Sequence, residues 1–254
     1  MLWRENTGMT LTAALMTGAV RPQPWTGDAG FLGILMLDTR FPRPPGDIGH
    51  PDTFDVPTRR HVVHGAWPAK VVQSAKGLRA ARLLPAFVDA VQALQRDGAL
   101  AITTSCGFLV LLQPELQAAV QVPLVTSSLL QLPGLLAGQP HVGVLTISAS
   151  QLGAEHLLAA GVPPERLGDV IVQGVDSAGE FATAILGNRA SLDVQKACSD
   201  VVAAARALKE RAPALASVVL ECTNMPPYRQ AIEAATGLQT WALTDDPRLT
   251  RPWR

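Results

Sequence analysis

The chain has 254 residues, of which 48% are hydrophobic and 17% are charged, and its formal net charge at pH 7 is zero. This composition is typical of a compact globular protein with a large core and excludes a disordered chain. Binding to nucleic acid or to an anionic membrane needs an excess of positive charge, so neither partner is expected. No apolar run reaches the ~18–20 residues of a membrane span.

The first 30 residues and the cysteines bear on the compartment. Only Arg4 supplies positive charge near the start and Glu5 offsets it, so a secretory signal is not expected there. We expect this segment to be a loosely attached arm or a contact in a homo-oligomer. Three cysteines do not form a disulfide framework, which predicts a reducing, cytoplasmic location and directs attention to thiol chemistry.

From residue 31 onward, short apolar runs alternate with helical stretches. Phe31–Leu37 predicts a buried strand, Asp38–Arg59 a long loop rich in Pro and Gly, and Leu83–Asp97 an amphipathic helix. The elements predicted further along are strands at Ala99–Thr104, Val122–Val125, His141–Leu145, Val170–Val172 and Ser217–Leu220, with a long helix at Ser191–Arg211. This alternation predicts βαβ units, and therefore an α/β fold with a mostly parallel sheet.

Ligands of such folds collect at the carboxyl ends of the strands. The residues at these ends are rich in hydroxyls and thiols: Asp38, Thr39, Thr104, Ser105, Cys106, Thr126, Ser127, Ser128, the segment 146–150, Glu221, Cys222, Thr223 and Asn224. A weak internal repeat runs through the chain, in which a helix, a turn and an apolar strand precede Cys106 and again precede Cys222.

A cysteine between a strand end and a helix start meets unpaired N–H groups, which favour the thiolate and make the sulfur a usable base or nucleophile. The alternative for Cys106 and Cys222 is a buried structural role, which is common for a free cysteine. Cys198 lies in the middle of a helix and is assigned to the core. His61 and His64 fall on opposite faces of strand-like sequence, so no metal site is predicted, and no cofactor motif is present.

The two strand-end cysteines, the second followed by Thr223, resemble the aspartate/glutamate/hydantoin racemase superfamily, and residues 37–47 resemble a less characterised racemase-like subgroup. The resemblance covers roughly Gly33 to Leu243. It implies two similar α/β domains related by pseudo-twofold symmetry, with the active site between them and one cysteine from each. The implied domains are 31–126 plus 225–254, and 127–224.

The resemblance implies a cofactor-independent racemase or epimerase that acts on a small carboxylate or a hydantoin-like compound. Inverting a stereocentre requires a base on one face and an acid on the other, and a thiol can serve in either role. Cys106 and Cys222 would alternate in these roles, and no metal or bound cofactor is expected. The partner implied is a small-molecule substrate.

Two differences from the superfamily pattern bear on the identity of the substrate. Gly107 and Phe108 stand where many members of the superfamily have Asn-Thr, and the Phe108 side chain cannot donate a hydrogen bond. Asn224 stands where glutamate racemases often have His. Free aspartate or glutamate is therefore a doubtful substrate, and Phe108 is expected to narrow the pocket or make it apolar.

Other candidate substrate-binding residues have structural alternatives. Asp38 and Thr39 match an acidic–hydroxyl pair of the superfamily, or they cap a turn. Ser127 and Ser128 bind a carboxylate, or they cap the next helix. Thr104 is a candidate by its place at a strand end. Two other functions stay open: a cysteine-dependent maleate isomerase or arylmalonate-type decarboxylase, and a non-catalytic small-molecule binding protein.

Overall fold

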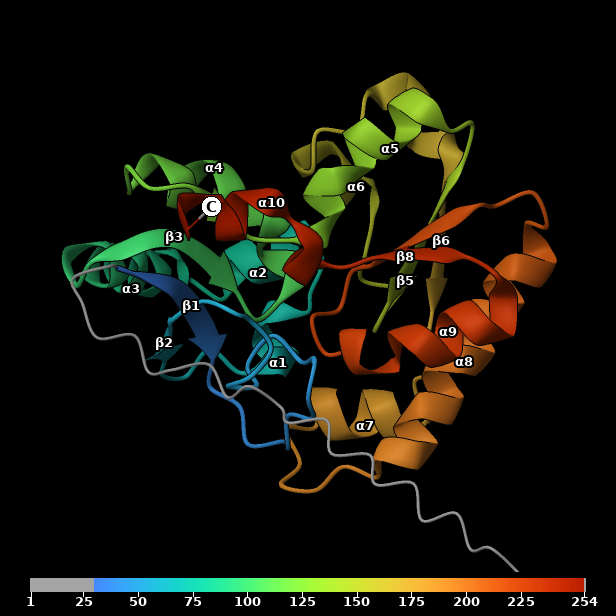
Figure 1. Ribbon diagram of the computed structural model, residues 1–254, viewed down its shortest axis with the longest axis horizontal. Coiled ribbons are helices and arrows are strands. Elements are labelled where there is room, and N and C mark those ends of the chain that lie inside the picture. The colour runs from blue at the N-terminus through green and yellow to red at the C-terminus, as the bar shows by residue number, and fades with distance from the viewer. Residues whose placement is uncertain (1–29, 254) are drawn as a thin grey trace, which may run out of the picture.

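The computed structural model describes residues 30–253, so the arm expected over the first 30 residues lies outside this range except for Gly30. Two parallel sheets of four strands each are surrounded by helices, which confirms the predicted fold of two similar α/β halves. Figure 1 shows the two sheets side by side, the first at the left and the second at the right. The same strand order is built twice along the chain.

The first sheet has the order β2-β1-β3-β4, and its strands all run parallel. The strands are β1 (Phe31–Leu37), β2 (Thr58–Val63), β3 (Ala99–Thr104) and β4 (Leu124–Val125). All seven residues of β1 are buried, as expected of an unbroken apolar run in a sheet covered on both faces. β1 and β3 have their predicted bounds, whereas β2 begins two residues inside the segment expected to be a loop.

The second sheet has the order β6-β5-β7-β8 and is also parallel. Its strands are β5 (Val142–Thr146), β6 (Val170–Gly174), β7 (Ser217–Leu220) and β8 (Gln239–Trp241). β7 lies beside β5 as β3 lies beside β1. Cys106 and Cys222 therefore follow equivalent strands, which confirms the internal repeat.

Helices connect the strands and cover the sheets (Figure 1). Their bounds are α1 (Pro68–Val71), α2 (Ala75–Ala80), α3 (Leu84–Arg96), α4 (Gln113–Ala118), α5 (Leu132–Gly138), α6 (Ala154–Ala159), α7 (Glu180–Leu186), α8 (Val194–Arg211), α9 (Arg229–Thr236) and α10 (Pro247–Thr250). The two long helices α3 and α8 were both predicted. Each buries an apolar face, with Phe87 and Leu94 in α3 and with Val201 and Leu208 in α8.

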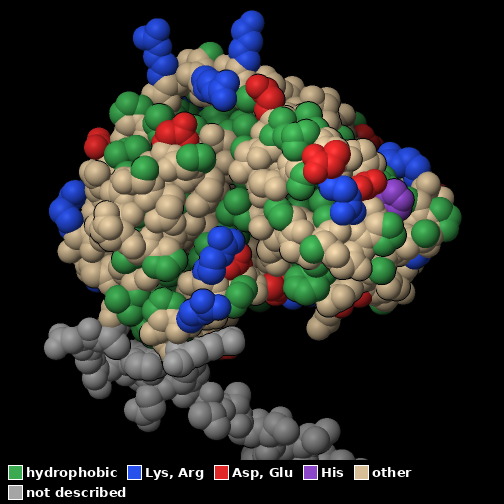
Figure 2. Space-filling view, turned by 90° about the horizontal axis from the view of Figure 1, so that it is seen from above, with side chains coloured by type: hydrophobic (Ala, Val, Ile, Leu, Met, Phe, Trp, Pro, Cys, Tyr) green, Lys and Arg blue, Asp and Glu red, His purple; other side chains and the backbone are tan. Residues whose placement is uncertain are grey.

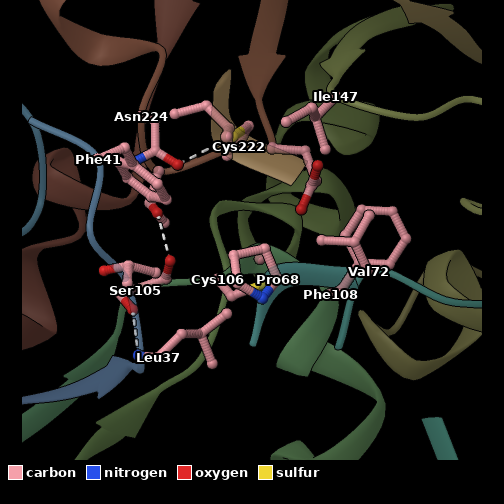
Figure 3. A pocket seen from close by; sticks show the side chains of 15 residues that line it. Leu37, Phe41, Pro68, Val72, Ser105, Cys106, Phe108, Ile147, Cys222 and Asn224 are labelled. Carbon is pink, nitrogen blue, oxygen red and sulfur yellow. Dashed lines mark hydrogen bonds between the residues drawn. The ribbon is translucent and has the colours of Figure 1, made fainter. Parts of the chain in front are cut away.

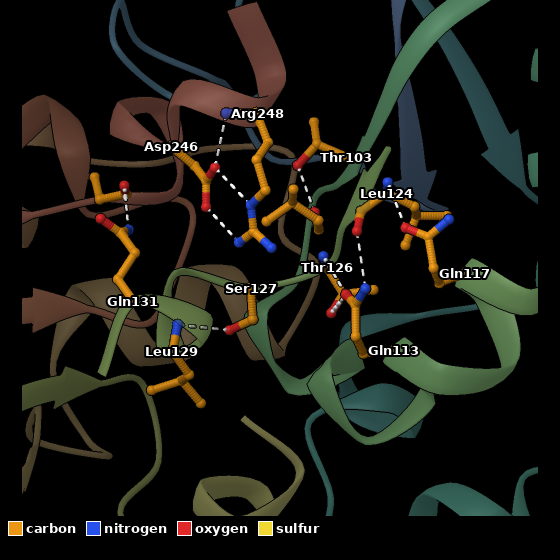
Figure 4. A network of polar contacts seen from close by, with 12 residues as sticks. Thr103, Gln113, Gln117, Leu124, Thr126, Ser127, Leu129, Gln131, Asp246 and Arg248 are labelled. Atoms are coloured by element: carbon orange, nitrogen blue, oxygen red, sulfur yellow. Dashed lines mark hydrogen bonds and ion pairs between the residues drawn. The ribbon is translucent and has the colours of Figure 1, made fainter. Parts of the chain in front are cut away.

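Strand β4 has two residues, and side chains of α4 supply hydrogen bonds that a longer ladder would otherwise provide (Figure 4). The Gln117 side chain accepts from the Leu124 N–H at 2.9 Å. Gln113 accepts from the Thr126 N–H at 2.9 Å and donates to the Leu124 carbonyl at 2.8 Å. The backbone at this strand end is thereby paired before the chain crosses to the second sheet.

The C-terminal segment returns to the first sheet later than expected. Strand β8 pairs with β7, so residues 225–241 lie with the second sheet and their assignment to the first domain needs correction. Beyond β8 the chain does return, because Leu243 and Leu249 pack against Leu32 and Ile34 of β1. Figure 1 shows this end of the chain, with α10, beside the first sheet.

The two halves share a continuous core. One hydrophobic cluster contains Leu35 and Ile102 from the first sheet together with Val144 and Val219 from the second. On the face seen in Figure 2, basic and acidic side chains are interspersed. Across residues 30–253, no helix combines the length and the apolar character needed to cross a membrane.

Candidate active site

The carboxyl ends of β1, β3, β5 and β7 meet at one cavity between the two sheets (Figure 3). The cavity has an empty volume of about 330 Å³. Most of its wall is apolar and is formed by side chains such as Phe41, Val72, Phe108 and Ile147. Because β3 and β7 end here, the cavity also receives the residues that follow these two strands.

Both strand-end cysteines line this cavity. Cys106 follows β3 and Cys222 follows β7, and each is a free thiol with 7% of its surface exposed. In Figure 3, Cys222 lies on the side of Asn224, whereas Cys106 lies on the side of Ser105. The two thiols thus reach one space from different sheets, as a pair of acid/base groups must.

Cys106 sits at the start of a 3-10 helix, Gly107–Leu112. The backbone N–H groups of Phe108 and Leu109 lie close enough to favour the thiolate, and the Leu109 N–H also donates to the Cys106 carbonyl at 3.1 Å. Burial nevertheless raises the pKa of the Cys106 thiol strongly, and the nearby Glu221 carboxyl raises it further. Cys106 is therefore a neutral thiol.

Cys222 ends a chain of polar contacts. Its sulfur donates to Asn224 Oδ1 at 3.5 Å, and Asn224 Nδ2 donates to Asp47 at 2.6 Å. The Asp47 carboxylate also accepts from Arg43 at 2.8 Å and from the Gly49 N–H at 2.8 Å. Burial is the main cause that raises the pKa of Cys222, followed by the charge of Glu221, so this thiol keeps its proton.

Glu221 is a cavity residue that the sequence interpretation did not select. It is 1% exposed, and its Oε2 accepts from Thr146 Oγ1 at 2.8 Å. Burial raises the pKa of this carboxyl to about 7, although the hydrogen bonds from Thr146 and from the Ile147 N–H oppose the shift. The signal in the sequence was a carboxylate at the end of an otherwise apolar strand.

Gly107 is explained by Glu221. A Cβ atom at position 107 would lie 2.3 Å from the Glu221 carbonyl oxygen and 2.3 Å from its Oε1 atom. No side chain fits there without a shift of the structure, because the backbone carbonyl of residue 221 is as close as its carboxyl. Gly107 thus permits the close approach of the two strand ends.

The structure brings a majority of the predicted site residues together. Those that line the cavity are Thr39, Cys106, Gly107, Phe108, Cys222, Thr223 and Asn224. Thr39 Oγ1 accepts from Arg43 at 2.8 Å, and Ser105 Oγ accepts from the Leu37 N–H at 2.9 Å. Each of these two hydroxyls keeps its own O–H group as a donor for a ligand.

Two predicted site residues are absent from the cavity lining because they hold backbone instead. Asp38 accepts from the Gly65 N–H at 2.9 Å, and this bond is the main cause that lowers the pKa of its carboxyl. Thr104 donates to the Thr126 carbonyl at 2.7 Å. Asp38 therefore has the turn-capping role that was its alternative.

Ser127 and Ser128 are also absent from the lining. Ser127 accepts from the Leu129 N–H at 3.2 Å, which is the capping role offered as its alternative (Figure 4). Ser128 donates to the Leu220 carbonyl at 2.8 Å, at the end of β7. Both hydroxyls are buried, and their geometry serves the backbone rather than a ligand.

Within residues 30–253, no group of three or more His, Cys, Asp or Glu side chains is arranged to hold a metal ion. The polar groups that line the cavity are its two thiols, the Glu221 carboxyl, and the hydroxyl and amide groups around them. This set can remove a proton from carbon, return one, and place a carboxyl beside a bound ligand.

Comparison with known proteins shows sequence similarity to a group of lyases, while no family model matches the chain. A dimethylsulfoniopropionate lyase from Durusdinium (clade D) is 29% identical over 245 residues, which cover 87% of this chain and 79% of the relative. Dimethylsulfoniopropionate lyase 7 of Emiliania huxleyi is 30% identical over 238 residues, covering 85% of this chain and 68% of the relative.

Solved structures give the fold. A glutamate racemase isoform of Bacillus anthracis matches with a TM-score of 0.54 at 12% identity, covering 89% of this chain and 81% of its own. An aspartate racemase homologue of Pyrococcus horikoshii matches with a TM-score of 0.51 at 15% identity, covering 88% and 97%. The architecture is therefore that of the aspartate/glutamate racemase fold, as the resemblance implied.

Proposed function

Because the chain belongs to the dimethylsulfoniopropionate lyase family, we propose that it is a lyase that cleaves dimethylsulfoniopropionate or a closely related β-sulfonio carboxylate. This replaces the expected racemase as the leading activity, while keeping the expected cysteine chemistry. The observation that carries the proposal beyond family membership is the Cys106 thiol in an apolar cavity, at the start of a 3-10 helix whose first backbone N–H groups favour the thiolate.

The proposed reaction is a β-elimination. The Cys106 thiolate takes the proton from the carbon next to the substrate carboxylate, and the C–H electron pair forms the new carbon–carbon double bond. The bond from the β-carbon to sulfur breaks, and its electron pair leaves with dimethyl sulfide, so that acrylate remains. Cys106 then returns its proton to water.

Cys106 is assigned as the base because of its donors. The N–H groups of Phe108 and Leu109 stabilise negative charge on its sulfur. Burial and the charge of Glu221 oppose the ionisation of both thiols, but Asp47 adds to this at Cys222, whereas Arg43 favours the thiolate at Cys106. Cys222 therefore remains a thiol, which can donate a hydrogen bond within the cavity.

Donors for the substrate carboxylate lie on the side of β1 and of the segment after β7. The Thr39 and Ser105 hydroxyls keep an O–H to donate, and the Asn224 amide is held in place by its bond to Asp47 at 2.6 Å. Negative charge that builds up on the carboxylate as the α-proton leaves would be stabilised by such fixed donors.

A racemase or epimerase of a small carboxylate is the second candidate, and the cavity position of the Cys222 thiol is the observation that favours it. Such an enzyme would use both thiols, one on each face of the carbon. Elimination needs one base and a leaving group on the neighbouring carbon. The two activities therefore differ in their dependence on Cys222.

The test is to incubate the purified protein with dimethylsulfoniopropionate in D2O and to measure dimethyl sulfide, acrylate and deuterium in the remaining substrate. Stoichiometric dimethyl sulfide and acrylate, lost in the Cys106→Ser variant, would support the lyase. A panel of chiral carboxylic acids is incubated in parallel. Deuterium exchange at their α-carbons without elimination would overturn the lyase assignment in favour of the racemase.

A further inference from the structure

Glu221 is a buried carboxyl without a cationic partner. Its hydrogen bonds come from the Thr146 hydroxyl at 2.8 Å and from the Ile147 N–H. No ion pair involves it among the residues that the structure describes. An isolated buried carboxylate is costly, so such a group either keeps its proton or is matched by a positive charge from elsewhere.

The cavity supplies no such charge from its own wall. Glu221 is the one Asp, Glu, Lys or Arg among the described residues that line it, and the remainder are apolar side chains, thiols, hydroxyls, a glycine and an amide. Arg43, which lies near the cavity, is already paired with Asp47 at 2.8 Å. A ligand that enters this space therefore meets apolar walls and a single acidic group.

We propose that Glu221 is the specificity residue that binds the positive charge of an onium group, a sulfonium or quaternary ammonium whose methyl groups contact the apolar wall. This combination suits an onium ion because its charge carries an apolar shell and has no N–H or O–H to donate. Phe108 adds aromatic surface of the kind that binds onium ligands in other proteins, while the Phe41 ring already has the Arg43 guanidinium 4.7 Å from its centre. The identity of the reaction rests on the proposed function. The preference of the cavity for a cationic ligand does not depend on it.

Space for the Glu221 carboxyl is left by Gly107, which follows β3 in the other sheet. A Cβ atom on residue 107 would lie 2.3 Å from Glu221 Oε1 and 2.3 Å from the Glu221 carbonyl oxygen. The glycine therefore leaves room for both the backbone and the carboxyl of Glu221 beside the cavity.

The same contact connects ligand charge to thiol chemistry. The Glu221 carboxylate raises the pKa of both Cys106 and Cys222, and Asp47 adds to the effect at Cys222, while Arg43 opposes it at Cys106. A cation beside Glu221 offsets the carboxylate charge and favours the Cys106 thiolate. The substrate's own positive charge would then prepare the base that attacks it, whereas a neutral thioether would leave Cys106 protonated.

The test compares two inert ligands of the same shape by calorimetry. One is trimethylammoniopropionate, and the other is its carbon isostere, in which a tert-butyl group replaces the trimethylammonio group. The wild type should bind the cationic ligand roughly tenfold or more tightly than the isostere, since a desolvated charge pair is added. In Glu221→Gln the preference should fall to about twofold or less, because the amide carries no charge. Glu210→Gln, on the exposed face of α8, is the matched control and should keep the preference.

A second measurement needs no variant. Because the pKa of Glu221 lies at about 7 in the free protein, the cationic ligand should bind more tightly as the pH rises through 7, and the isostere should not. An equal affinity for the two ligands at all pH values, or an undiminished preference in Glu221→Gln, would overturn the inference. Lyase activity is measured separately, so a protein that prefers the onium ligand but releases no dimethyl sulfide would refute the proposed function alone.

Discussion

The ends of β3 and β7 are two versions of one structure. The Ser105 N–H donates to the Leu35 carbonyl at 2.9 Å, and the Glu221 N–H donates to the Leu145 carbonyl at 2.9 Å. Each of these two residues also accepts, through its side chain, an N–H from the end of the neighbouring strand or the residue after it. For Ser105 the donor is Leu37 at 2.9 Å, and for Glu221 it is Ile147.

The difference lies in the side chains around each cysteine. Ser105 and Gly107 flank Cys106, whereas Glu221 and Thr223 flank Cys222. Thr223 reaches across to donate to the Ser105 carbonyl at 2.8 Å, while the space that a side chain would need at Gly107 is filled by Glu221. The repeated backbone sets the positions of the thiols, and the unlike neighbours place a carboxyl beside one cysteine and a hydroxyl and a glycine beside the other.

The largest expected effect comes from replacing each thiol in turn. Cys106→Ser should lower the turnover of dimethylsulfoniopropionate by about 10²–10⁴-fold, because an alcohol is far less acidic than a thiol and cannot serve as the base. Cys222→Ser should lower it by less than about tenfold, since a hydroxyl can still donate a hydrogen bond. Turnover is measured by release of dimethyl sulfide, and Cys198→Ser in α8 serves as the control.

Equal losses in the two variants would show that the strand ends are chemically equivalent. That result would point to proton transfer by both thiols, as in the racemase alternative, and would contradict the assignment of Cys106 as the single base. The binding of an inert ligand should survive in both variants, which separates loss of the base from loss of the fold.

The sequence was sufficient for much of the fold. Continuous apolar runs gave β1, β3 and β7 with their bounds, and two apolar helix faces gave α3 and α8. The strand β8 was not predicted because three residues are too few to show a periodic pattern of apolar positions. Because β8 pairs with β7, the chain returns to the first half later than the sequence predicted. Such a short strand forms because a neighbouring strand is there to pair with it. Whether that partner is present depends on the tertiary structure and not on the local sequence.

The candidate site, like the fold, could be predicted from the sequence only in part. The two cysteines were found because a strand end followed by a helix start is a local pattern. Glu221 was named among the strand-end residues but was not predicted to bind substrate. Its place in the cavity depends on a contact with Thr146, which lies 75 positions away in the sequence. Ser127 and Ser128 were expected beside the substrate, but they do not line the cavity, and their hydroxyls are bonded to backbone groups of Leu129 and Leu220.

The second prediction uses the acid at the β7 end. The pKa of Glu221 is raised from its ordinary 4.5 to about 7, so between these pH values the folded protein keeps a proton that the unfolded chain has lost. Stability should therefore fall as the pH rises through this window and stay level above it. Glu221→Gln cannot lose this proton, so its stability relative to the wild type should increase by about 3 kcal/mol across the window.

Urea unfolding of the ligand-free proteins on both sides of the window measures this difference, with Glu210→Gln as the control. The exposed carboxyl of Glu210 should give the same difference from the wild type at each pH. A constant difference for Glu221→Gln as well would mean that the carboxyl titrates normally, and that burial at the β7 end does not penalise its charge.

The third prediction concerns the space at the β3 end. Gly107→Ala should lower the free energy of unfolding by about 1–3 kcal/mol, because its Cβ would overlap the Glu221 carbonyl and carboxyl oxygens at 2.3 Å. Gly134→Ala in α5, where no atom lies within 4 Å, should instead raise it by about 0.5–1 kcal/mol.

The same substitution in a Glu221→Ala background isolates the contact between the two strand ends. Half of the overlap is then removed, since only the carbonyl oxygen of residue 221 remains close. The penalty of Gly107→Ala should shrink accordingly. If it does not, the carboxyl moves aside at little cost, and the coupling between these two positions is weaker than the geometry indicates.

The smallest effect is expected from the hydrogen bond that joins the two ends. Thr223→Val preserves the shape of the side chain but removes the donor to the Ser105 carbonyl, which lies 2.8 Å away in a buried setting. The free energy of unfolding should fall by about 1 kcal/mol, as for the loss of one neutral hydrogen bond. Ser199→Ala, which removes an exposed bond within α8, should have almost no effect. Ser128→Ala removes a second buried bond at these strand ends, to the Leu220 carbonyl at the end of β7. Because both halves contribute to one continuous core, the double variant should lose about the sum of the two single effects, within about 0.5 kcal/mol. A much larger loss would show that these two bonds, rather than the core, hold the strand ends together, and would make the alignment of Cys106 with Cys222 depend on them.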